Sequence, residues 1–475
     1  MAKHGIYISE QATSVSTPVV AESGIPFVIG SAPIQSAESP AGVGVPVLCT
    51  SWAEAIEKLG YSDDWEKYGI CEFMYSHFQL FGCQPAIFCN LLNPVKMNEA
   101  VAADDMAVTN HKITLPLEAI NDKAMIVKAS GGAGSAYIKD ADYAVYYDDG
   151  SCVIELLEDG SIYTATSLNV AYSKVDTAAV SAKAVATGLE AIELCMGKVG
   201  IVPDIICAPG FSGDTGVGAV MATKAGGING MFNAKALIDL STDEIEGAAD
   251  YSAVVALKNS GNFVDENEIV CWPMLKLGDK KFHMSTQLAG LMAKVDNTNN
   301  GCPYESPSNK SFKCDSIILD NGAEVPMTLA QANILNSGGV VTALGFMGGI
   351  VCWGNYTSCY PTNTDVKDYF IPISRVFDWV GKTEIYTFWG KLDKPMNRRL
   401  IATILDTINI WFNGLTGMGY ILGGRAEFLE AENPLTGLMA GIMRIHNYIT
   451  PPSPAQEIDF ILEYDVSYVT SALQG

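Results

Sequence analysis

This chain of 475 residues lacks the short motifs that carry most metal and phosphate chemistry. Its twelve cysteines form no Cys-x-x-Cys pair and its five histidines are scattered, so no zinc-ligand spacing occurs. No P-loop is present, and Gly216-Val217-Gly218 lacks the third glycine of a dinucleotide fingerprint. Cysteines such as Cys89 and Cys207 stand in apolar runs, which predicts reduced thiols in a core. We therefore expect neither a metal nor a cofactor.

Basic residues are also scarce. There are 29 Lys and Arg against 53 Asp and Glu, a net charge of −24. Nucleic acid and anionic membranes are disfavoured as partners, because phosphate binding needs clustered bases. No apolar run of about 18 residues could form a transmembrane helix, and the start Met1–His4 has no apolar signal region. These features predict a protein made in the cytosol, with acidity that serves solubility or docking onto a basic partner.

Catalytic candidates are few. Ser212 follows a predicted strand in Gly210-Phe211-Ser212-Gly213, but Asp214 stands where a nucleophile elbow needs glycine, so a plain turn is predicted. Asp239 near a strand end is the best single candidate, and the sequence places no suitable partner beside it. The sequence therefore predicts a protein that is not an enzyme, with no catalytic residue.

The C-terminal segment has the most regular pattern of the chain. Period-two alternation over about a dozen residues, roughly twice the usual strand length, follows a spacer at Pro451–Pro454. Acidic residues fill most of one face, and the other face is apolar: Ile458, Phe460, Leu462, Tyr464, Val466 and Tyr468. This pattern predicts a long terminal strand.

The N-terminal segment offers a shorter extended partner. Ile6, Tyr7 and Ile8 begin it, and Thr, Ser and Val continue it to Val20. Two extended ends on a large chain predict arms that add strands to the sheets of neighbouring molecules. The alternative is that the terminal strand closes the sheet of its own domain. The predicted intersubunit contacts are Ile6, Tyr7, Ile8, Ile458, Phe460, Leu462, Tyr464 and Val466.

Between the ends, the patterns predict a multidomain α+β and α/β fold. A helix at Trp52–Leu59 has an N-cap in Ser51 and a stop in Gly60. Short strands, Ser161–Thr164 among them, predict an inserted β-sandwich or barrel. Further on, the patterns predict a helix at Val180–Cys195, a strand at Ala253–Ala256, and an amphipathic helix at Met396–Asn413 with Pro395 in its first turn. The predicted parts are an N-terminal arm (1–23), an α/β domain in two pieces (24–94 and 177–364), an inserted β domain (95–176), and a discontinuous C-terminal α+β domain with a strand arm (365–475).

Several segments together resemble one known family. They are Phe27–Pro33, Ala208-Pro209-Gly210, Leu335–Gly339, Val351–Gly354 and the run from Pro451 to Phe460. In these the chain resembles the contractile tail sheath proteins of myophages and contractile bacteriocins (tailocins). An arginine often stands two residues after the Trp-Gly of that family, and Tyr356 takes its place here.

The resemblance implies a virion structural protein of a contractile injection system. Such subunits form a helical sleeve of stacked hexameric rings around a tail tube, linked by strand exchange, and contract by rigid-body rearrangement to drive the tube through a cell envelope. The implied partners are further copies, the tube, and baseplate and tail terminator proteins. The implied location is a virion tail or tail-like particle assembled in the bacterial host cytoplasm. Possible tube-facing acids are Glu427, Glu430 and Glu432. Competing readings are a soluble cytosolic α/β enzyme with an inserted β domain, or another virion subunit.

Overall fold

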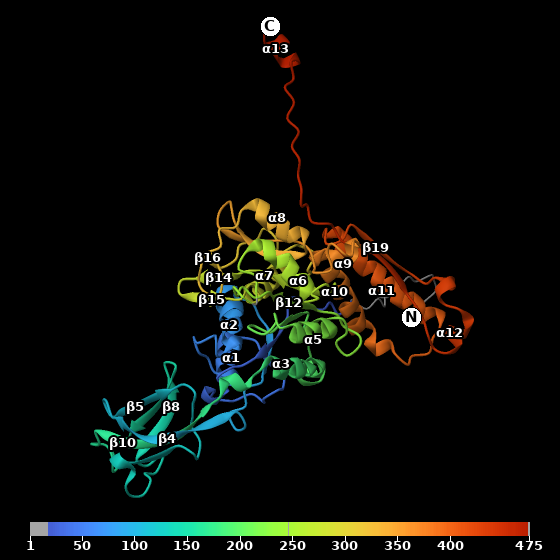
Figure 1. Ribbon diagram of the computed structural model, residues 1–475. Helices are drawn as coiled ribbons and strands as arrows, with labels where there is room; N and C mark the ends of the chain where they lie inside the picture. The colour runs from blue at the N-terminus through green and yellow to red at the C-terminus, as the bar shows by residue number, and fades with distance from the viewer. Residues whose placement is uncertain (1–17, 246, 474–475) are drawn as a thin grey trace, which may run out of the picture.

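A computed structural model describes residues 18–245 and 247–473 (Figure 1). Its centre is an eight-stranded sheet with the order β18-β17-β13-β12-β11-β1-β3-β2. Strands β17 to β3 in that order are parallel, and the edge strands β18 and β2 are antiparallel to their neighbours. The strands are Pro26–Gly30 (β1), Val47–Cys49 (β2), Ala86–Asn90 (β3), Ile205–Cys207 (β11), Lys235–Asp239 (β12), Glu268–Cys271 (β13), Val340–Gly345 (β17) and Ile350–Trp353 (β18).

Helices cover this sheet, and its inner strands are buried. Every residue of β1, β3, β11 and β13 is buried, as a parallel sheet covered on both faces requires. The covering helices are Trp52–Leu59 (α1), Gly69–Met74 (α2), Ala182–Gly188 (α3), Cys195–Val199 (α4), Thr215–Ala225 (α5), Tyr251–Ser260 (α6), Met284–Thr298 (α7) and Leu329–Ser337 (α8). A small sheet beside them joins Met274–Leu277 (β14), Lys280–Phe282 (β15) and Ser316–Ile318 (β16).

Helix α1 has the predicted caps. Ser51 Oγ accepts a hydrogen bond from Glu54 N at 3.2 Å, and Gly60 ends the helix with φ of +73°. A Cβ at Gly60 would lie 2.4 Å from Pro33 O, so the close approach requires glycine as well. The predicted helix and both of its ends are confirmed.

Two predicted elements of this region are wrong. Ala253–Ala256, predicted as a strand, lies inside α6, where the Asp250 side chain caps the first turn by accepting from Ser252 N at 3.0 Å. A short apolar run does not separate strand from helix, and here the cap decides. The predicted helix Val180–Cys195 is divided into α3, a 3-10 segment Leu189–Leu194, and α4. Helix α3 ends at Gly188, and the 3-10 segment follows it. A Cβ at Gly188 would lie 2.8 Å from the Leu91 side chain, so the backbone passes close to the residue that follows β3.

Residues between β3 and α3 form a β-rich lobe with a core of its own (teal in Figure 1). One sheet joins Asn98–Ala107 (β4), Ala119–Ile120 (β6), Ile126–Ala129 (β7) and Ser167–Val175 (β10); the other joins Lys112–Pro116 (β5), Tyr143–Asp148 (β8) and Ser151–Leu156 (β9). The predicted strand Ser161–Thr164 is wrong, because local bonds such as Tyr163 N to Gly160 O fold it into turns. The ten-residue β4 was not predicted, because its residues are mostly exposed and do not alternate.

The C-terminal part packs two long helices against a small sheet. Val366–Tyr369 (α9) precedes Ile371–Phe388 (α10) and Arg398–Gly417 (α11), and Gly423–Glu427 (β19) pairs with His446–Thr450 (β20) around Leu435–Met439 (α12). One face of α11 is buried, through Ile404, Ile408, Phe412 and Leu415, as its apolar period predicts. The prediction for Pro395 is wrong, because Asn397 is the N-cap, accepting from Leu400 N at 2.9 Å. Helix α10 was not predicted.

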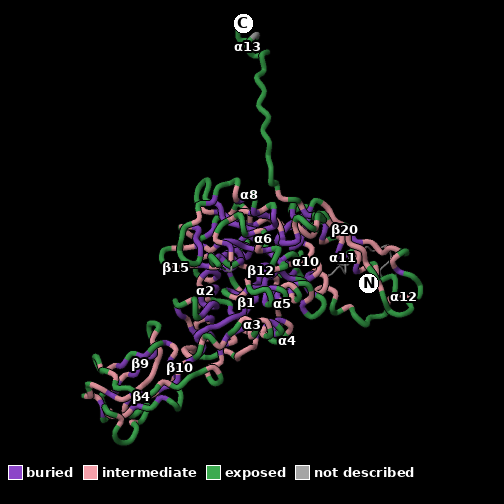
Figure 2. Tube along the Cα trace, in the orientation of Figure 1, coloured by how far each residue is buried: buried purple, intermediate pink, exposed green. Residues whose placement is uncertain are grey.

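The chain then leaves the body. Residues 451–465 have no secondary structure, and beyond Glu457 the chain runs away from the rest of the molecule to Ser467–Leu473 (α13) (Figures 1 and 2). The predicted terminal strand is not formed within this chain, because residues 458–465 pair with no described strand. At its end, Tyr468 lies in a helix that begins where the Asp465 carboxylate accepts from Ser467 N at 2.8 Å. Among the described residues, no helix is both long and apolar enough to cross a bilayer.

Candidate functional site at the roots of the two chain ends

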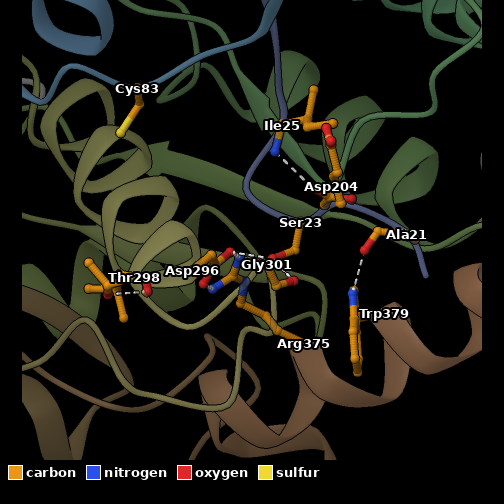
Figure 3. A network of polar contacts seen from close by, with 12 residues as sticks. Ala21, Ser23, Ile25, Cys83, Asp204, Asp296, Thr298, Gly301, Arg375 and Trp379 are labelled. Atoms are coloured by element: carbon orange, nitrogen blue, oxygen red, sulfur yellow. Dashed lines mark hydrogen bonds and ion pairs between the residues drawn. The ribbon is translucent and has the colours of Figure 1, made fainter. Parts of the chain in front are cut away.

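The N-terminal root, residues 18–25, lies along helix α10. Val19 N donates to Thr387 Oγ1 at 3.0 Å, and Ala21 N donates to Thr383 Oγ1 at 3.1 Å. Trp379 Nε1 donates to Ala21 O at 2.7 Å (Figure 3). The three helix residues are four apart, so they share one face of α10. This face fixes the direction in which the chain enters the body.

Three ion pairs fix α10 to the central sheet and its covering helix α7: the partners are Asp296 in α7, Asp204 just before β11, and Lys235 in β12. Arg375 contacts both carboxylate oxygens of the fully buried Asp296, which also lies 2.8 Å from Ser23 Oγ (Figure 3). Lys382 pairs with Asp204, whose other oxygen accepts from Ile25 N at 2.8 Å. The third pair, Lys235 with Asp378, spans 3.0 Å. Removing one partner of a buried pair is strongly destabilising, so this joint should behave as a rigid unit.

The C-terminal root, residues 451–457, lies in an open polar groove of about 820 Å³. Tyr356 Oη donates to Gln456 Oε1 at 2.6 Å. Tyr356 also stacks on Tyr360, with ring centroids 4.1 Å apart, and both line the groove with Pro452 and Pro454. Tyr356 stands where the family that the sequence resembles often has an arginine, and it holds the C-terminal root in place through Gln456.

Beyond this root, the terminal arm, residues 458–466, has no contact that would bury it. Phe460 is 86% exposed and Leu462 is 94% exposed. The other predicted contacts of the arm, Ile458, Tyr464 and Val466, are exposed too. The alternative that this segment closes the sheet of its own domain is wrong, since it pairs with no described strand. Ile6, Tyr7 and Ile8 lie outside the described residues.

The acids proposed to face a tube gather around His446. Glu432 pairs with His446 Nδ1 at 2.7 Å, and Glu427 is the register partner of His446 in the β19–β20 ladder. Glu427 also accepts from Arg425 Nε at 2.8 Å. Glu430 begins the short 3-10 turn Glu430–Glu432, which follows β19. The structure therefore brings these acids together at one end of the small sheet.

Asp239 has partners that the sequence did not reveal. Ser212 Oγ lies 3.1 Å from its Oδ2, and Ser285 N donates to its Oδ1 at 2.8 Å. Burial raises the pKa of Asp239. Nearby, Nδ1 of His283 pairs with Glu72 at 2.7 Å. The sequence could not place these partners beside Asp239, because Ser212 and Ser285 come from other segments of the chain. These bonds join the ends of β11 and β12 to α7, as a structural cluster would, and Ser212 lies in the predicted turn after β11.

In the part of the chain that the structure describes, neither the cysteines nor the other metal-ligating side chains gather into a metal centre. All twelve cysteines are unpaired, and all but the half-buried Cys314 are buried, which confirms that the cysteines predicted to lie in a core do so. The described parts of the chain hold no group of three or more His, Cys, Asp or Glu side chains that could bind a metal ion.

The residues missed by sequence reasoning are those of α10. Its run Ile371–Phe388 has apolar residues at helical spacing, with Pro372 in its first turn, which was the available signal. Its polar residues Arg375, Thr383 and Thr387 were not distinctive, because their partners lie far away in the sequence.

Comparison with known proteins gives a consistent result. No family model matches the chain. The tail sheath protein of Burkholderia phage BcepMu is 24% identical over 493 residues, covering 99% of this chain and 98% of that protein. The contracted helical sheath of the anti-feeding prophage has 14% identity and a TM-score of 0.57, covering 98% of this chain and 100% of that one. The contracted PVC sheath complex, an extracellular contractile injection system, has 14% identity and a TM-score of 0.57, covering 98% and 99%.

The resemblance drawn from the sequence is thereby confirmed. The chain is similar to a phage tail sheath protein along nearly its whole length, and its mixed α and β fold with several sheets is similar to that of the solved contracted sheaths. These relatives are structural proteins of phage tails and tail-like particles by name.

Proposed function

We propose that this relative of contractile tail sheath proteins is itself the repeating subunit of a contractile sheath. It assembles into a helical sleeve of stacked hexameric rings around a tail tube. The sleeve contracts by rigid-body rearrangement and drives the tube through a cell envelope. The protein acts mechanically rather than as an enzyme.

The observation that carries this proposal is the exposed terminal arm. Water-exposed apolar side chains on every second residue of an extended segment form half of a sheet interface, and that interface needs a second strand. In one copy the arm has no such strand among the described residues. A neighbouring copy can supply it.

The β19–β20 sheet is the acceptor that we propose. A two-stranded sheet is marginal on its own, and among the described strands neither outer edge of β19–β20 is paired. Each added strand contributes roughly half a dozen main-chain hydrogen bonds at about 1 kcal/mol net each. Burial of Ile458, Phe460, Leu462 and Tyr464 adds about 1.5–3 kcal/mol apiece. Ile6, Tyr7 and Ile8 are proposed to add a second strand.

Rigid bodies joined by such arms can rearrange without separating. The ion pairs of Arg375, Lys382 and Lys235 keep α10 and the central sheet together. The arm instead starts at a root that, among the described residues, is held by one side-chain hydrogen bond, from Tyr356 to Gln456. Movement is therefore expected at the roots rather than inside the body.

The domain division follows the apolar cores. We propose an N-terminal arm (1–23), an α/β domain (24–94 and 177–364), an inserted β domain (95–176) and a C-terminal sheath core domain with its arm (365–475). Three separate clusters of buried side chains support this division: one around the large sheet, one in the β-rich lobe, and one between α10 and α11.

The partners follow from the same model. They are further copies, a tail tube, and baseplate and tail terminator proteins, in a virion tail or tail-like particle assembled in the bacterial host cytoplasm. The acids Glu427, Glu430 and Glu432 are proposed to face the tube. Docking of this kind weakens as salt rises.

Two truncations test the proposal by negative-stain microscopy and light scattering. A chain ending at Gln456 loses the arm, and a chain ending at Val466 loses α13 but keeps the arm. We expect tubes or stacked rings from the full chain and from the Val466 chain, and folded small species from the Gln456 chain. Tubes from the Gln456 chain, or small closed oligomers from the full chain at every concentration, would contradict the proposal.

A further inference from the structure

The tip of the β17–β18 hairpin exposes two large apolar side chains. Phe346 is 62% exposed and Met347 is 83% exposed. The hairpin stem pairs Gly345 with Ile350, and the turn closes through Gly348 and Gly349, whose φ angles are +84° and +124°. A regular ladder thus holds two hydrophobic side chains out in water.

An apolar groove of about 670 Å³ lies elsewhere on the same chain. Phe232 and Tyr386 form part of its wall, and the partly exposed Met231 and Trp389 stand at its surface. Methionine side chains adapt to the shape of an inserted group, so this lining suits an apolar ligand from another protein surface.

The tip lies on the side of the central sheet where its parallel strands end, and the groove lies on the side where they begin. Strands β11, β12, β13 and β17 are parallel. The hairpin follows the carboxyl end of β17, whereas groove residues Ile201 and Phe232 precede the amino ends of β11 and β12. The two features of one copy therefore cannot meet, but those of two copies can meet head to tail. Such a contact is heterologous, so it can repeat from copy to copy through a ring or a helical filament.

Opposite charges accompany the two apolar features. Lys313 is exposed and follows Phe312, whose N–H donates to Ile350 O at 3.0 Å beside the hairpin. Glu22 is exposed and lines the groove. Among the described residues, neither side chain has an ion-pair partner.

We propose that the Phe346–Met347 tip of one copy inserts into the groove of the next copy, with Lys313 facing Glu22. This inference rests on the proposed function, because a repeated head-to-tail contact of this kind needs an assembly of many copies, as in the proposed sheath. It supplies a link between rigid bodies that is separate from the exchanged arms.

Cross-linking between two variants tests the contact. Met347→Cys protein and Met231→Cys protein are mixed, assembled and mildly oxidised. The native cysteines are nearly all buried, so the new thiols should react first. We expect a disulfide-linked dimer from the mixture and none from either variant alone. Ile138→Cys, at a 66% exposed apolar site in the β-rich lobe, replaces Met347→Cys as the matched control and should give no dimer.

Charge reversal gives a second measurement. Lys313→Glu and Glu22→Lys should each lower the cross-link yield by about twofold to fivefold, as expected for an exposed pair, and the two together should restore it. Tubes without the cross-link would overturn this inference and leave the sheath proposal standing. Absence of both tubes and cross-link would overturn both. A cross-link that forms only after removal of residues 1–17 would show that this segment occupies the groove, and would also overturn the inference.

Discussion

Replacing Arg375 by methionine tests whether the joint between α10 and the central sheet depends on a buried charge pair. The Arg375 side chain is 4% exposed, and Asp296 is fully buried. The substitution leaves the Asp296 carboxylate with Ser23 as its remaining side-chain partner. An uncompensated buried charge costs about 3–5 kcal/mol. The double variant Arg375→Met with Asp296→Leu removes both charges, so it should lose far less stability than Arg375→Met alone.

The measurement must be local, because a multidomain chain does not unfold in one two-state step. Hydrogen exchange of the α10 amides reports opening of this joint. A loss of 3–5 kcal/mol corresponds to roughly two to three and a half decades of protection. Lys367→Met is the matched control, because Lys367 is half exposed on α9 and its pair with Asp368 lies at the surface. If the double variant lost as much protection as Arg375→Met, the unpaired charge would not be the cause and the reasoning would fail.

Further predictions concern the arm root, the polar cluster and one turn. Tyr356→Phe removes the bond to Gln456, worth about 0.5–1.5 kcal/mol, so proteolysis within residues 457–466 should be faster than in Tyr360→Phe. Burial alone would lower the pKa of His283, but Glu72 raises it to about 9. The stabilisation from this ion pair should be complete below about pH 6.5 and should be lost as the pH rises through about 9. In urea titrations at several pH values, His283→Gln should make the unfolding midpoint less dependent on pH over this range. Gly60 and Gly44 both have left-handed backbone, with φ of +73° and +68°. The new Cβ of Gly60→Ala would lie 2.4 Å from Pro33 O, whereas that of Gly44→Ala would meet no atom within 4 Å. Gly44→Ala should cost about 1–2 kcal/mol, and Gly60→Ala should lower the melting temperature clearly more. A larger loss in Gly44→Ala would contradict the structural reading.

Much of the central region could be predicted from local sequence. The helix Trp52–Leu59 carries its own caps, and β1 and β3 are short apolar runs next to glycine or proline. The elements that failed lacked such signals. Ala253–Ala256 is equally compatible with strand and helix. The exposed β4 shows no alternation in its sequence, and its pairing with the distant β10 is visible only in the folded structure.

The candidate site was predicted in part. The alternation after Pro454 identified an exposed apolar segment, but the sequence did not show that α13 would end it or that Tyr356 would hold its base. Asp239 was noticed as a single acid, whereas its partners Ser212 and Ser285 come from other segments.

By itself, the sequence determined elements with strong local signals such as the capped helix Trp52–Leu59, the acidic charge, the lack of metal and phosphate motifs, and the apolar alternation at the C-terminal end. These properties depend on neighbouring residues and on composition. The tertiary structure alone decided that Arg375 meets Asp296, that Trp379 meets Ala21, and that the Phe346 tip and the groove lie on the sides of the central sheet where its parallel strands end and begin. Such contacts join residues distant in the chain, and only the folded arrangement of the sheet and helices brings them together or keeps them apart.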